Sequence, residues 1–247
     1  MIIGISGRMG SGKNTVGEII QKLCITNNGP QFEQKAFAGK LKQIASLLTG
    51  IPLEKFENQE FKKQEMSEEW GMTYRVFLQK LGTEAMRDGL HENVWVNSLF
   101  SDYKLNQVWK TAKQLNSEFA SSVEEYPNWV ITDMRFANEM EAVKERGGIT
   151  IRVTRYKVGD KVYWSDPEDV SSSVYEIAEV YQDFCIIYNA YSEAEVPYHE
   201  IKHYSKSLHT SETGLDNFTF DYEILNNDSI EDLVEKVREI LINEKIL

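Results

Sequence analysis

The sequence is poor in cysteine, in long apolar runs and in basic charge. Of its 247 residues only two are cysteines, Cys24 and Cys185, and their spacing fits no metal-binding or redox motif. We therefore expect free thiols and a reducing compartment. No apolar run approaches the ~18 residues of a membrane-spanning helix, and residues 1–5 carry neither a basic n-region nor a cleavage site. We expect a cytoplasmic protein without a signal peptide or a membrane span.

Acidic residues outnumber basic ones, with 39 Asp and Glu against 27 Lys and Arg and a formal charge of −12. This balance argues against a broad nucleic-acid surface, which needs a basic face. A single nucleotide is different, because a few local cations can hold one phosphate group. The hydrophobic fraction of 41% is ordinary for a globular chain and argues against global disorder.

Hydrophobic periodicity predicts strands that alternate with helices. We expect strands at 2–6, 31–37, 129–132, 149–154 and 222–225, and helices from Lys13, at 38–49, 73–81, 91–118 and 137–146, and after Ser229, which forms a capping box with Asp232. This order predicts an α/β fold in which a parallel sheet lies between layers of helices. Residues 156–207 interrupt the rhythm and predict a small β-rich or mixed, lid-like insertion within a single domain of residues 1–247.

The clearest motif follows the first strand, where Gly7-Arg8-Met9-Gly10-Ser11-Gly12-Lys13 matches the pattern G-x-x-x-x-G-K of a phosphate-binding loop. Glycines let several backbone N–H groups point at one phosphate, and the N-terminus of the following helix adds a favourable dipole. We expect Lys13 to reach the β- and γ-phosphates of ATP. The usual Ser or Thr after the lysine is Asn14 here, so either Asn14 or Thr15 is a candidate ligand for Mg²⁺.

A second candidate lies at the end of the strand 129–132. Asp133 is in the position of a carboxylate that holds Mg²⁺ or its waters, and Arg135 lies two residues later, at the sheet edge where ligands collect. A planar cation at that place suits a phosphate group. The alternative is a helix-capping aspartate followed by a surface arginine.

Together these segments make the chain resemble the bacteriophage deoxynucleoside monophosphate kinases. The resemblance covers most of the chain apart from 101–126 and 156–207, and the order and spacing of its segments carry it. Beyond the loop they are Phe37-Ala38-Gly39-Lys40-Leu41-Lys42, Arg75, Leu78-Gln79-Lys80-Leu81-Gly82-Thr83-Glu84, Val94-Trp95-Val96, Thr132-Asp133-Met134-Arg135 with Glu139, His209-Thr210-Ser211-Glu212 with Gly214-Leu215, and Asn226-Asn227-Asp228. It implies an ATP- and Mg²⁺-dependent kinase with a P-loop nucleoside monophosphate kinase fold, acting in the host cytoplasm if a phage encodes it.

The resemblance also implies the residues of the site. Those expected to hold ATP are Gly10, Ser11, Gly12, Lys13, Asn14 and Thr15 at its phosphates, and Asn226 and Asn227 near its adenine. Those expected around the monophosphate substrate are Leu41, Lys42, Arg75, Gly82, Thr83, Trp95, Asp133, Arg135 and Glu139. The expected catalytic residues are Lys13, Arg75, Asp133 and Arg135, and the expected metal ligands are Asn14 and Asp133.

Several of these roles have a physical reason and also a structural alternative. Lys42, Arg75 and Arg87 can neutralise the acceptor phosphate, although Lys42 and Arg87 would also suit an exposed surface. Trp95 can stack on a base or a sugar, or lie in the core. Glu139 can accept a hydrogen bond from the base or the ribose.

The remaining segments have open roles. His209 belongs to a pocket wall or a closing segment, or is structural, since phosphoryl transfer needs no general base. Arg152 and Arg155 precede the insertion and are candidate lid cations. The aromatic residues of the insertion suit an enlarged lid or a homodimer contact. They are Tyr163, Trp164, Tyr175, Tyr181, Tyr188, Tyr191, Tyr198 and Tyr204.

Three rival activities share the loop. Another small-molecule kinase, acting on dephospho-coenzyme A or on phosphomevalonate, would differ in its acceptor. A nucleotide switch or ATPase would hydrolyse ATP without an acceptor. A degenerate loop would serve only binding or assembly, and the intact Gly12-Lys13 with Asp133 and Arg135 argues against it. The expected partner is therefore a small nucleotide, not nucleic acid or a membrane.

Overall fold

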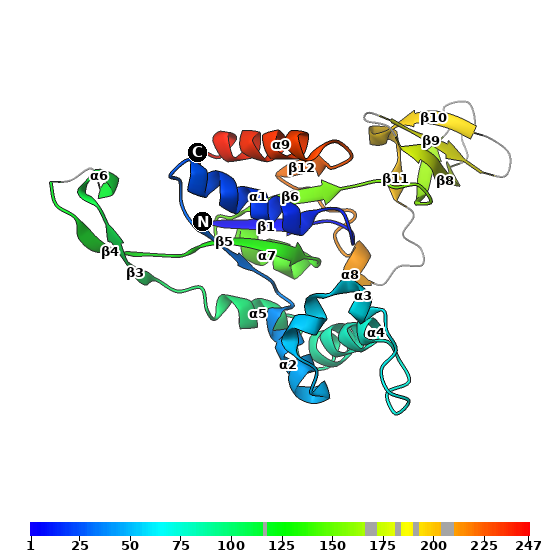
Figure 1. The fold of residues 1–247 in the computed structure, drawn as a ribbon, viewed down its shortest axis with the longest axis horizontal. Coiled ribbons are helices and arrows are strands. Elements are labelled where there is room, and N and C mark those ends of the chain that lie inside the picture. Colours follow the sequence, from blue (N-terminus) through cyan, green and yellow to red (C-terminus); the bar gives the residue numbers. More distant parts are fainter. Residues whose placement is uncertain (116–117, 166–171, 181–183, 190–192, 204–209) are drawn as a thin grey trace. The chain divides into compact units, whose positions relative to one another are not determined.

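The central feature of the fold is a five-stranded sheet in the order β12-β6-β1-β5-β2, drawn in Figure 1. The structure is a computed structural model that describes residues 1–115, 118–165, 172–180, 184–189, 193–203 and 210–247. The five strands are β1 (Ile2–Ser6), β2 (Phe32–Lys35), β5 (Asn128–Met134), β6 (Ile149–Thr154) and β12 (Tyr222–Leu225). β12 pairs with β6, and β2 pairs with β5, in both cases in parallel. Helices flank this sheet, which confirms the predicted α/β class.

The chain divides into two compact units. The first unit comprises Met1–Ile5 and Pro30–Thr150, and the second comprises Ser6–Gly29 and Ile151–Leu247. We describe each unit by itself. The single domain of residues 1–247 stays a prediction.

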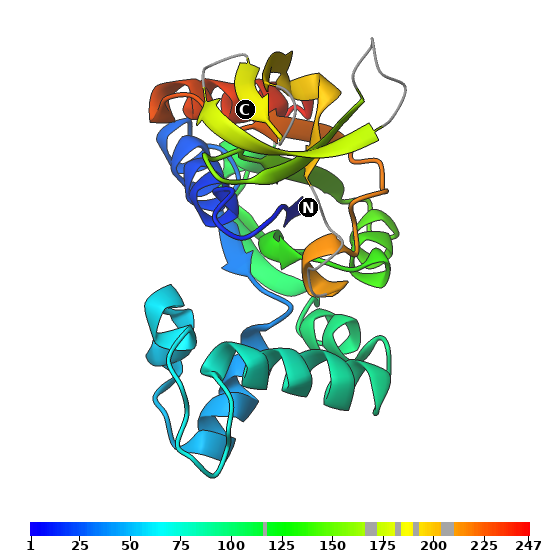
Figure 2. The ribbon, with the colours of Figure 1, turned by 90° about the vertical axis from the view of Figure 1, so that its right-hand side faces the viewer.

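The first unit contains β1, β2, β5 and a group of helices. Its other elements are α2 (Gly39–Thr49), the 3-10 helix η1 (Leu53–Glu57), α3 (Gln59–Lys62), α4 (Tyr74–Gln79), the π-helix η2 (Lys80–Asp88), α5 (Val94–Phe100), β3 (Asn106–Lys110), α6 (Ala112–Leu115), β4 (Ser121–Glu125) and α7 (Ala137–Lys144). Figure 2 shows the helices of residues 39–100 gathered in one group, in blue to teal. Ala45, Phe56, Met66 and Phe77 form a hydrophobic cluster within that group.

The helix predicted over 91–118 is wrong beyond residue 100. Val94–Phe100 is helical, but β3 then leads into a hairpin with β4, in which Val108 lies opposite Val123, and the short α6 lies between the two strands. Polar cross-strand contacts stabilise it, including an ion pair between Lys110 and Glu125. The pairing is with a segment beyond the predicted helix, so no periodicity within 91–118 could reveal it.

The second unit contains the glycine-rich loop, two long helices and the insertion. Its elements besides β6 and β12 are α1 (Lys13–Thr26), β7 (Lys161–Ser165), β8 (Ser172–Val180), β9 (Phe184–Tyr188), β10 (Glu193–Pro197), the 3-10 helix η3 (Tyr198–Glu200), β11 (Lys202–His203), α8 (Thr210–Thr213) and α9 (Ile230–Asn243). α1 and α9 lie side by side, as Figure 1 shows. The predicted capping box is confirmed, because the Ser229 hydroxyl accepts from the Asp232 N–H and the Asp232 carboxylate accepts from the Ser229 N–H.

The insertion is a small antiparallel sheet in the order β10-β9-β8-β7-β11, which confirms its predicted β-rich character. Trp164, Tyr175 and Tyr198 lie in its hydrophobic core. These three side chains are therefore core residues of the small sheet, and the choice between a lid and a homodimer contact for the insertion stays a prediction. Tyr181, Tyr191, Tyr204 and His209 lie outside the described residues. None of the helices in the described ranges has the length and hydropathy that crossing a bilayer requires.

Candidate active site

The loop between β1 and α1 has three glycines with a positive φ, Gly7, Gly10 and Gly12, and other parts of the chain closely approach two of them. Gly12 is the N-cap of α1 and has a φ of 102°, and a Cβ placed on it would lie 2.4 Å from Asn226 Nδ2. Gly7 leaves no room for a side chain, because a Cβ there would lie 2.2 Å from the Val153 carbonyl oxygen. The glycines of the motif are therefore required by close packing as well as by backbone conformation.

Lys13 and Ser11 face the interior of this loop. The Lys13 ammonium donates to the carbonyl oxygens of Gly7 at 2.5 Å and Arg8 at 2.7 Å. Ser11 is 2% exposed, and within the described part of the chain its hydroxyl has no hydrogen-bond partner. An unpartnered buried hydroxyl costs free energy, and an oxygen-rich ligand such as a phosphate would supply its partner.

The N-terminus of α1 also fits an anion. No side chain caps it, and its first turn contains no acidic residue. The first N–H groups of a helix lack intrahelical acceptors, and its dipole favours negative charge there. The loop therefore fits a phosphate group in two ways: the N-terminus of α1 favours an anion, and the buried Ser11 hydroxyl needs a hydrogen-bond partner.

The two asparagines after β12 hold two different segments. Asn226 Nδ2 donates to the Ser11 carbonyl at 2.8 Å and so fixes the loop. Asn227 bonds both backbone groups of Tyr156, accepting from its N–H at 3.0 Å and donating to its carbonyl at 3.0 Å. The two asparagines therefore anchor the loop and the backbone of Tyr156. Asn14 is exposed in the first turn of α1, and Thr15 is half-buried.

Arg8 and Arg152 converge on one carboxylate in the second unit. Arg8 pairs with Asp216 at 2.9 Å, and Arg152 pairs with Asp216 at 3.4 Å and donates to the Leu215 carbonyl at 2.9 Å. The predicted lid cation Arg152 therefore lies in an ion-pair network, whereas Arg155 is exposed. No sequence motif indicated Asp216, which is 208 residues from Arg8.

In the first unit, Asp133 holds the start of α2. Its two carboxylate oxygens accept from the backbone N–H groups of Phe37 at 2.7 Å and Ala38 at 2.9 Å. Ala38 is the N-cap of α2, which has no side-chain cap of its own. A carboxylate oxygen with one hydrogen bond keeps further acceptor capacity, so this structural role leaves room for a metal-bound water.

Glu139 and Arg87 form a buried ion pair of 2.7 Å, with 4% and 8% of their side chains exposed. The other Glu139 oxygen accepts from the backbone N–H groups of Arg135 at 2.7 Å and Phe136 at 3.2 Å. Burial, followed by the charge of Asp133, raises the pKa of Glu139 to about 7, against the opposing effect of its hydrogen bonds and of Arg87. Glu139 thus fixes the turn that carries Arg135, and Arg87 is not the surface residue that the sequence left open.

Four cations gather around α3 in the first unit. Burial, followed by the positive charges of Lys42, Arg75 and Arg135, lowers the pKa of Lys62 to about 8, while Glu57 acts in the opposite direction. Lys42 pairs with Glu57 at 2.6 Å, and Arg75 donates to Gln59 at 3.0 Å. The structure thus brings the predicted residues Lys42, Arg75 and Arg135 together, and adds Lys62. We call Lys42, Lys62, Arg75 and Arg135 the cation cluster.

The other predicted substrate residues mainly pack against one another. Leu41 is buried and lies close to Gly82. A Cβ placed on Gly82 would be 2.8 Å from the Leu41 side chain. Trp95 is 5% exposed and donates its indole N–H to the Gly82 carbonyl at 2.8 Å. This is the core role that the sequence left open for Trp95. Thr83 is half-buried on the π-helix η2.

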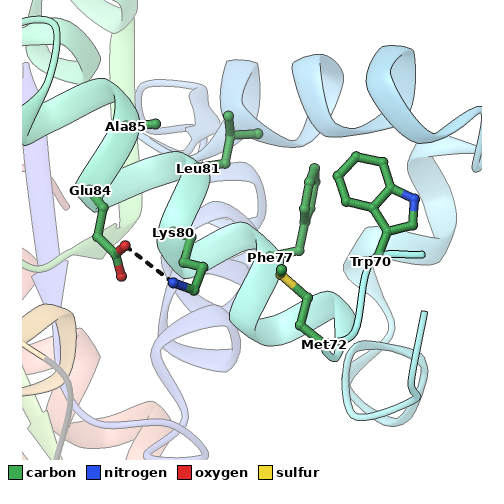
Figure 3. Close-up of a pocket in the computed structure, with 7 residues that line it drawn as sticks. All are labelled: Trp70, Met72, Phe77, Lys80, Leu81, Glu84 and Ala85. Carbon is green, nitrogen blue, oxygen red and sulfur yellow. Dashed lines mark hydrogen bonds and ion pairs between the residues drawn. The ribbon is translucent and has the colours of Figure 1, made fainter. Parts of the chain in front are cut away.

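A pocket of about 430 Å³ lies beside α4 and η2 in the first unit. Figure 3 shows the Trp70 and Phe77 rings next to each other and the Lys80–Glu84 ion pair on the opposite side. The lining residues are Trp70, Met72, Phe77, Lys80, Leu81, Glu84 and Ala85, none of which was predicted to touch a ligand. The described residues contain no group of three or more His, Cys, Asp and Glu with metal-binding geometry.

Comparison with known proteins adds one informative relative. No protein-family profile matches the sequence. A protein of Acanthamoeba polyphaga mimivirus is 29% identical to it over 190 residues, which are 73% of this chain and 88% of the viral protein. That protein carries the provisional name deoxynucleotide monophosphate kinase. The chain is therefore similar to the mimivirus protein over most of the length of both.

Proposed function

We propose that this protein is a kinase that transfers the γ-phosphoryl group of ATP to a deoxynucleoside monophosphate. The observation that carries the proposal is the loop after β1, with Lys13 inside it and the unpartnered Ser11 hydroxyl. The substrate class comes from the name of the mimivirus relative. The cation cluster supports it, because it suits a second phosphorylated molecule.

On the donor side, we assign the phosphates of ATP to the loop residues Gly10 to Thr15. Lys13 would bring positive charge to the β- and γ-phosphates, and the N-terminus of α1 would bind them through backbone N–H groups. Mg²⁺, when bound with ATP, supplies further positive charge there. Asn14 and Asp133 offer oxygen atoms, the donor type that Mg²⁺ prefers, and stay our candidate ligands.

On the acceptor side, we assign the monophosphate to the cation cluster. A nucleoside monophosphate is close to a dianion at neutral pH, and it must approach another anion, ATP. Arg75 and Arg135 provide planar donors that can bind two phosphate oxygens at once. Lys62 and Lys42 add charge, and Glu57 holds Lys42 in place.

The reaction needs no proton acceptor. The bond between the γ-phosphorus and its bridging oxygen breaks, and a phosphate oxygen of the acceptor bonds to the same phosphorus, which gives ADP and a deoxynucleoside diphosphate. The protein then contributes positioning and charge. By holding the N–H of Arg135, Glu139 would keep that cation in place.

An acceptor screen tests the proposal. ADP release is measured with Mg·ATP and each deoxy- and ribonucleoside monophosphate, and with dephospho-coenzyme A, phosphomevalonate or no acceptor. We expect release to depend on one or more deoxynucleoside monophosphates. Release without an acceptor would instead identify an ATPase, and release only with the other acceptors would identify a different kinase.

Lys62 predicts how acceptor binding depends on pH. Because its pKa is lowered to about 8, Lys62 is charged at neutral pH and loses its charge as the pH rises through that value. The acceptor phosphate, with a second pKa near ~6, stays ionised over the same range. We expect the KM for the acceptor to rise several-fold from about pH 7 to about pH 9, and to rise less in Lys62→Arg, since arginine keeps its charge.

The control for this prediction is Lys63→Arg. Lys63 is adjacent in sequence and pairs with Glu60 on the surface, where 57% of its side chain is exposed. It should show the wild-type pH profile. Identical profiles for wild type and Lys62→Arg would remove Lys62 from the acceptor site.

A further inference from the structure

The insertion begins with a turn that is tied to the phosphate-binding loop. Asn226 and Asn227 are consecutive, and the first holds the Ser11 carbonyl while the second holds both backbone groups of Tyr156. Tyr156 is buried, and its ring stacks on Tyr198 with centroids 5.0 Å apart. The loop and the base of the insertion therefore share one anchor within the second unit.

This anchoring continues through a closed turn at residues 157–160. The Lys157 N–H donates to the Asp160 carboxylate at 2.8 Å, and the Asp160 N–H donates to the Lys157 carbonyl at 3.0 Å. Gly159 has a φ of 85°, and its N–H bonds the Ile177 carbonyl of β8 at 2.8 Å. The backbone of Lys157 is thus fixed on both sides, although its side chain is exposed.

The Lys157 ammonium lies directly over the loop. A Cβ placed on Gly10 would be only 2.7 Å from Lys157 Nζ. Within the ranges that the structure describes, no carboxylate pairs with this ammonium. A cation held next to a phosphate-binding backbone, without a counter-charge of its own, is suited to an anion bound by that backbone.

We propose that Lys157 binds the phosphates of the donor nucleotide, as a second lysine beside Lys13 that is supplied by the insertion. This inference rests on the proposed function, because it needs ATP at the loop. It gives the insertion of residues 156–207 a role in the reaction: the small sheet holds the turn that presents Lys157. A protein with the same phosphate-binding loop but without the insertion would lack this cation.

The test is nucleotide binding by titration calorimetry with ATP, ADP and adenosine. Lys157→Ala removes one charge-assisted hydrogen bond at an exposed site. We expect this variant to bind ATP about tenfold more weakly than wild type does. Lys157→Arg should restore most of the affinity because it keeps the charge. Adenosine has no phosphate, so its affinity should be the same in all variants.

The matched control is Lys161→Ala, which removes an exposed lysine of β7 in the same small sheet. It should bind ATP as wild type does, and both alanine variants should unfold at the wild-type temperature. If wild type binds ATP and phosphorylates its acceptor while Lys157→Ala and Lys161→Ala bind ATP equally, this inference alone is overturned. If wild type binds no ATP, the proposed function fails and this inference with it.

Discussion

Replacing Lys13 with methionine is expected to lower the turnover of the proposed reaction by roughly 10³-fold. The side chain is a cation placed inside a loop that fits phosphate, where it donates to the carbonyls of Gly7 and Arg8. During transfer, charge moves onto the oxygens around the γ-phosphorus, and a fixed cation stabilises that state more than the bound substrate. Methionine keeps an unbranched apolar side chain that is one atom shorter, and removes the charge.

Turnover should be measured at saturating ATP and acceptor, together with ATP affinity by calorimetry. The loss of two hydrogen bonds to loop carbonyls also costs about 1 kcal/mol each in stability, so unfolding must be followed in parallel. Lys22→Met is the matched control, because Lys22 is an exposed lysine of the same helix. A Lys13→Met protein that is folded and turns over within about tenfold of wild type would contradict the assigned role.

The parts of the fold that the sequence predicted well are those with local causes. β6 and β12 have the predicted bounds, Ile149–Thr154 and Tyr222–Leu225, because each is a short segment rich in strand-forming residues between turn residues. The start of α1 at Lys13 follows from the glycines that precede it, and the start of α9 follows from its capping box.

The parts that were missed depend on residues distant in sequence. The hairpin of β3 and β4 pairs Asn106 with Glu125, and its two strands have no helical or strand pattern strong enough alone. Lys62 lies in the charged segment 53–70, where nothing in its spacing distinguishes it from Lys63. Only the packing of α3 beside neighbouring helices places it with Lys42 and Arg75.

The candidate site residues also divide into those that a local motif indicated and those whose surroundings depend on distant segments. The turn at Gly7 to Lys13 could be predicted because its glycines form a contiguous motif, and the binding of phosphate there stays a prediction. The role of Glu139 could not, because the sequence does not show that Arg87 is buried against it. Glu139 is a buried carboxylate that pairs with Arg87 and accepts from the Arg135 N–H, and its contact with the substrate stays a prediction.

Replacing Arg87 with methionine is expected to destabilise the first unit by about 3–5 kcal/mol, since it leaves the Glu139 carboxylate buried without its cation. The pair is almost completely buried, and Arg87 also donates to the Glu92 carbonyl at 3.1 Å and to Asn138 at 2.8 Å. Its guanidinium lies 3.7 Å from the centre of the Phe136 ring. Methionine fills much of the same volume, so the loss should be electrostatic.

The destabilisation should depend on pH. Burial already raises the pKa of Glu139 to about 7 from an ordinary value of 4.5, and removal of Arg87 raises it further. Between the unfolded and the folded pKa the native state binds more protons than the unfolded state, so stability falls as pH rises. The stability difference between wild type and Arg87→Met should therefore be larger at about pH 8 than at about pH 5, by an amount on the order of 1 kcal/mol or more.

Urea unfolding at both pH values measures this difference, and the double variant Arg87→Met, Glu139→Gln separates charge from packing. Glutamine cannot ionise, so the double variant should recover part of the lost stability and lose the pH dependence. An Arg87→Met protein that is equally destabilised at both pH values would show that Glu139 is not the group that needs Arg87. If the double variant recovers stability but not turnover, the charged pair matters for holding Arg135, because Glu139 accepts a hydrogen bond from the Arg135 N–H.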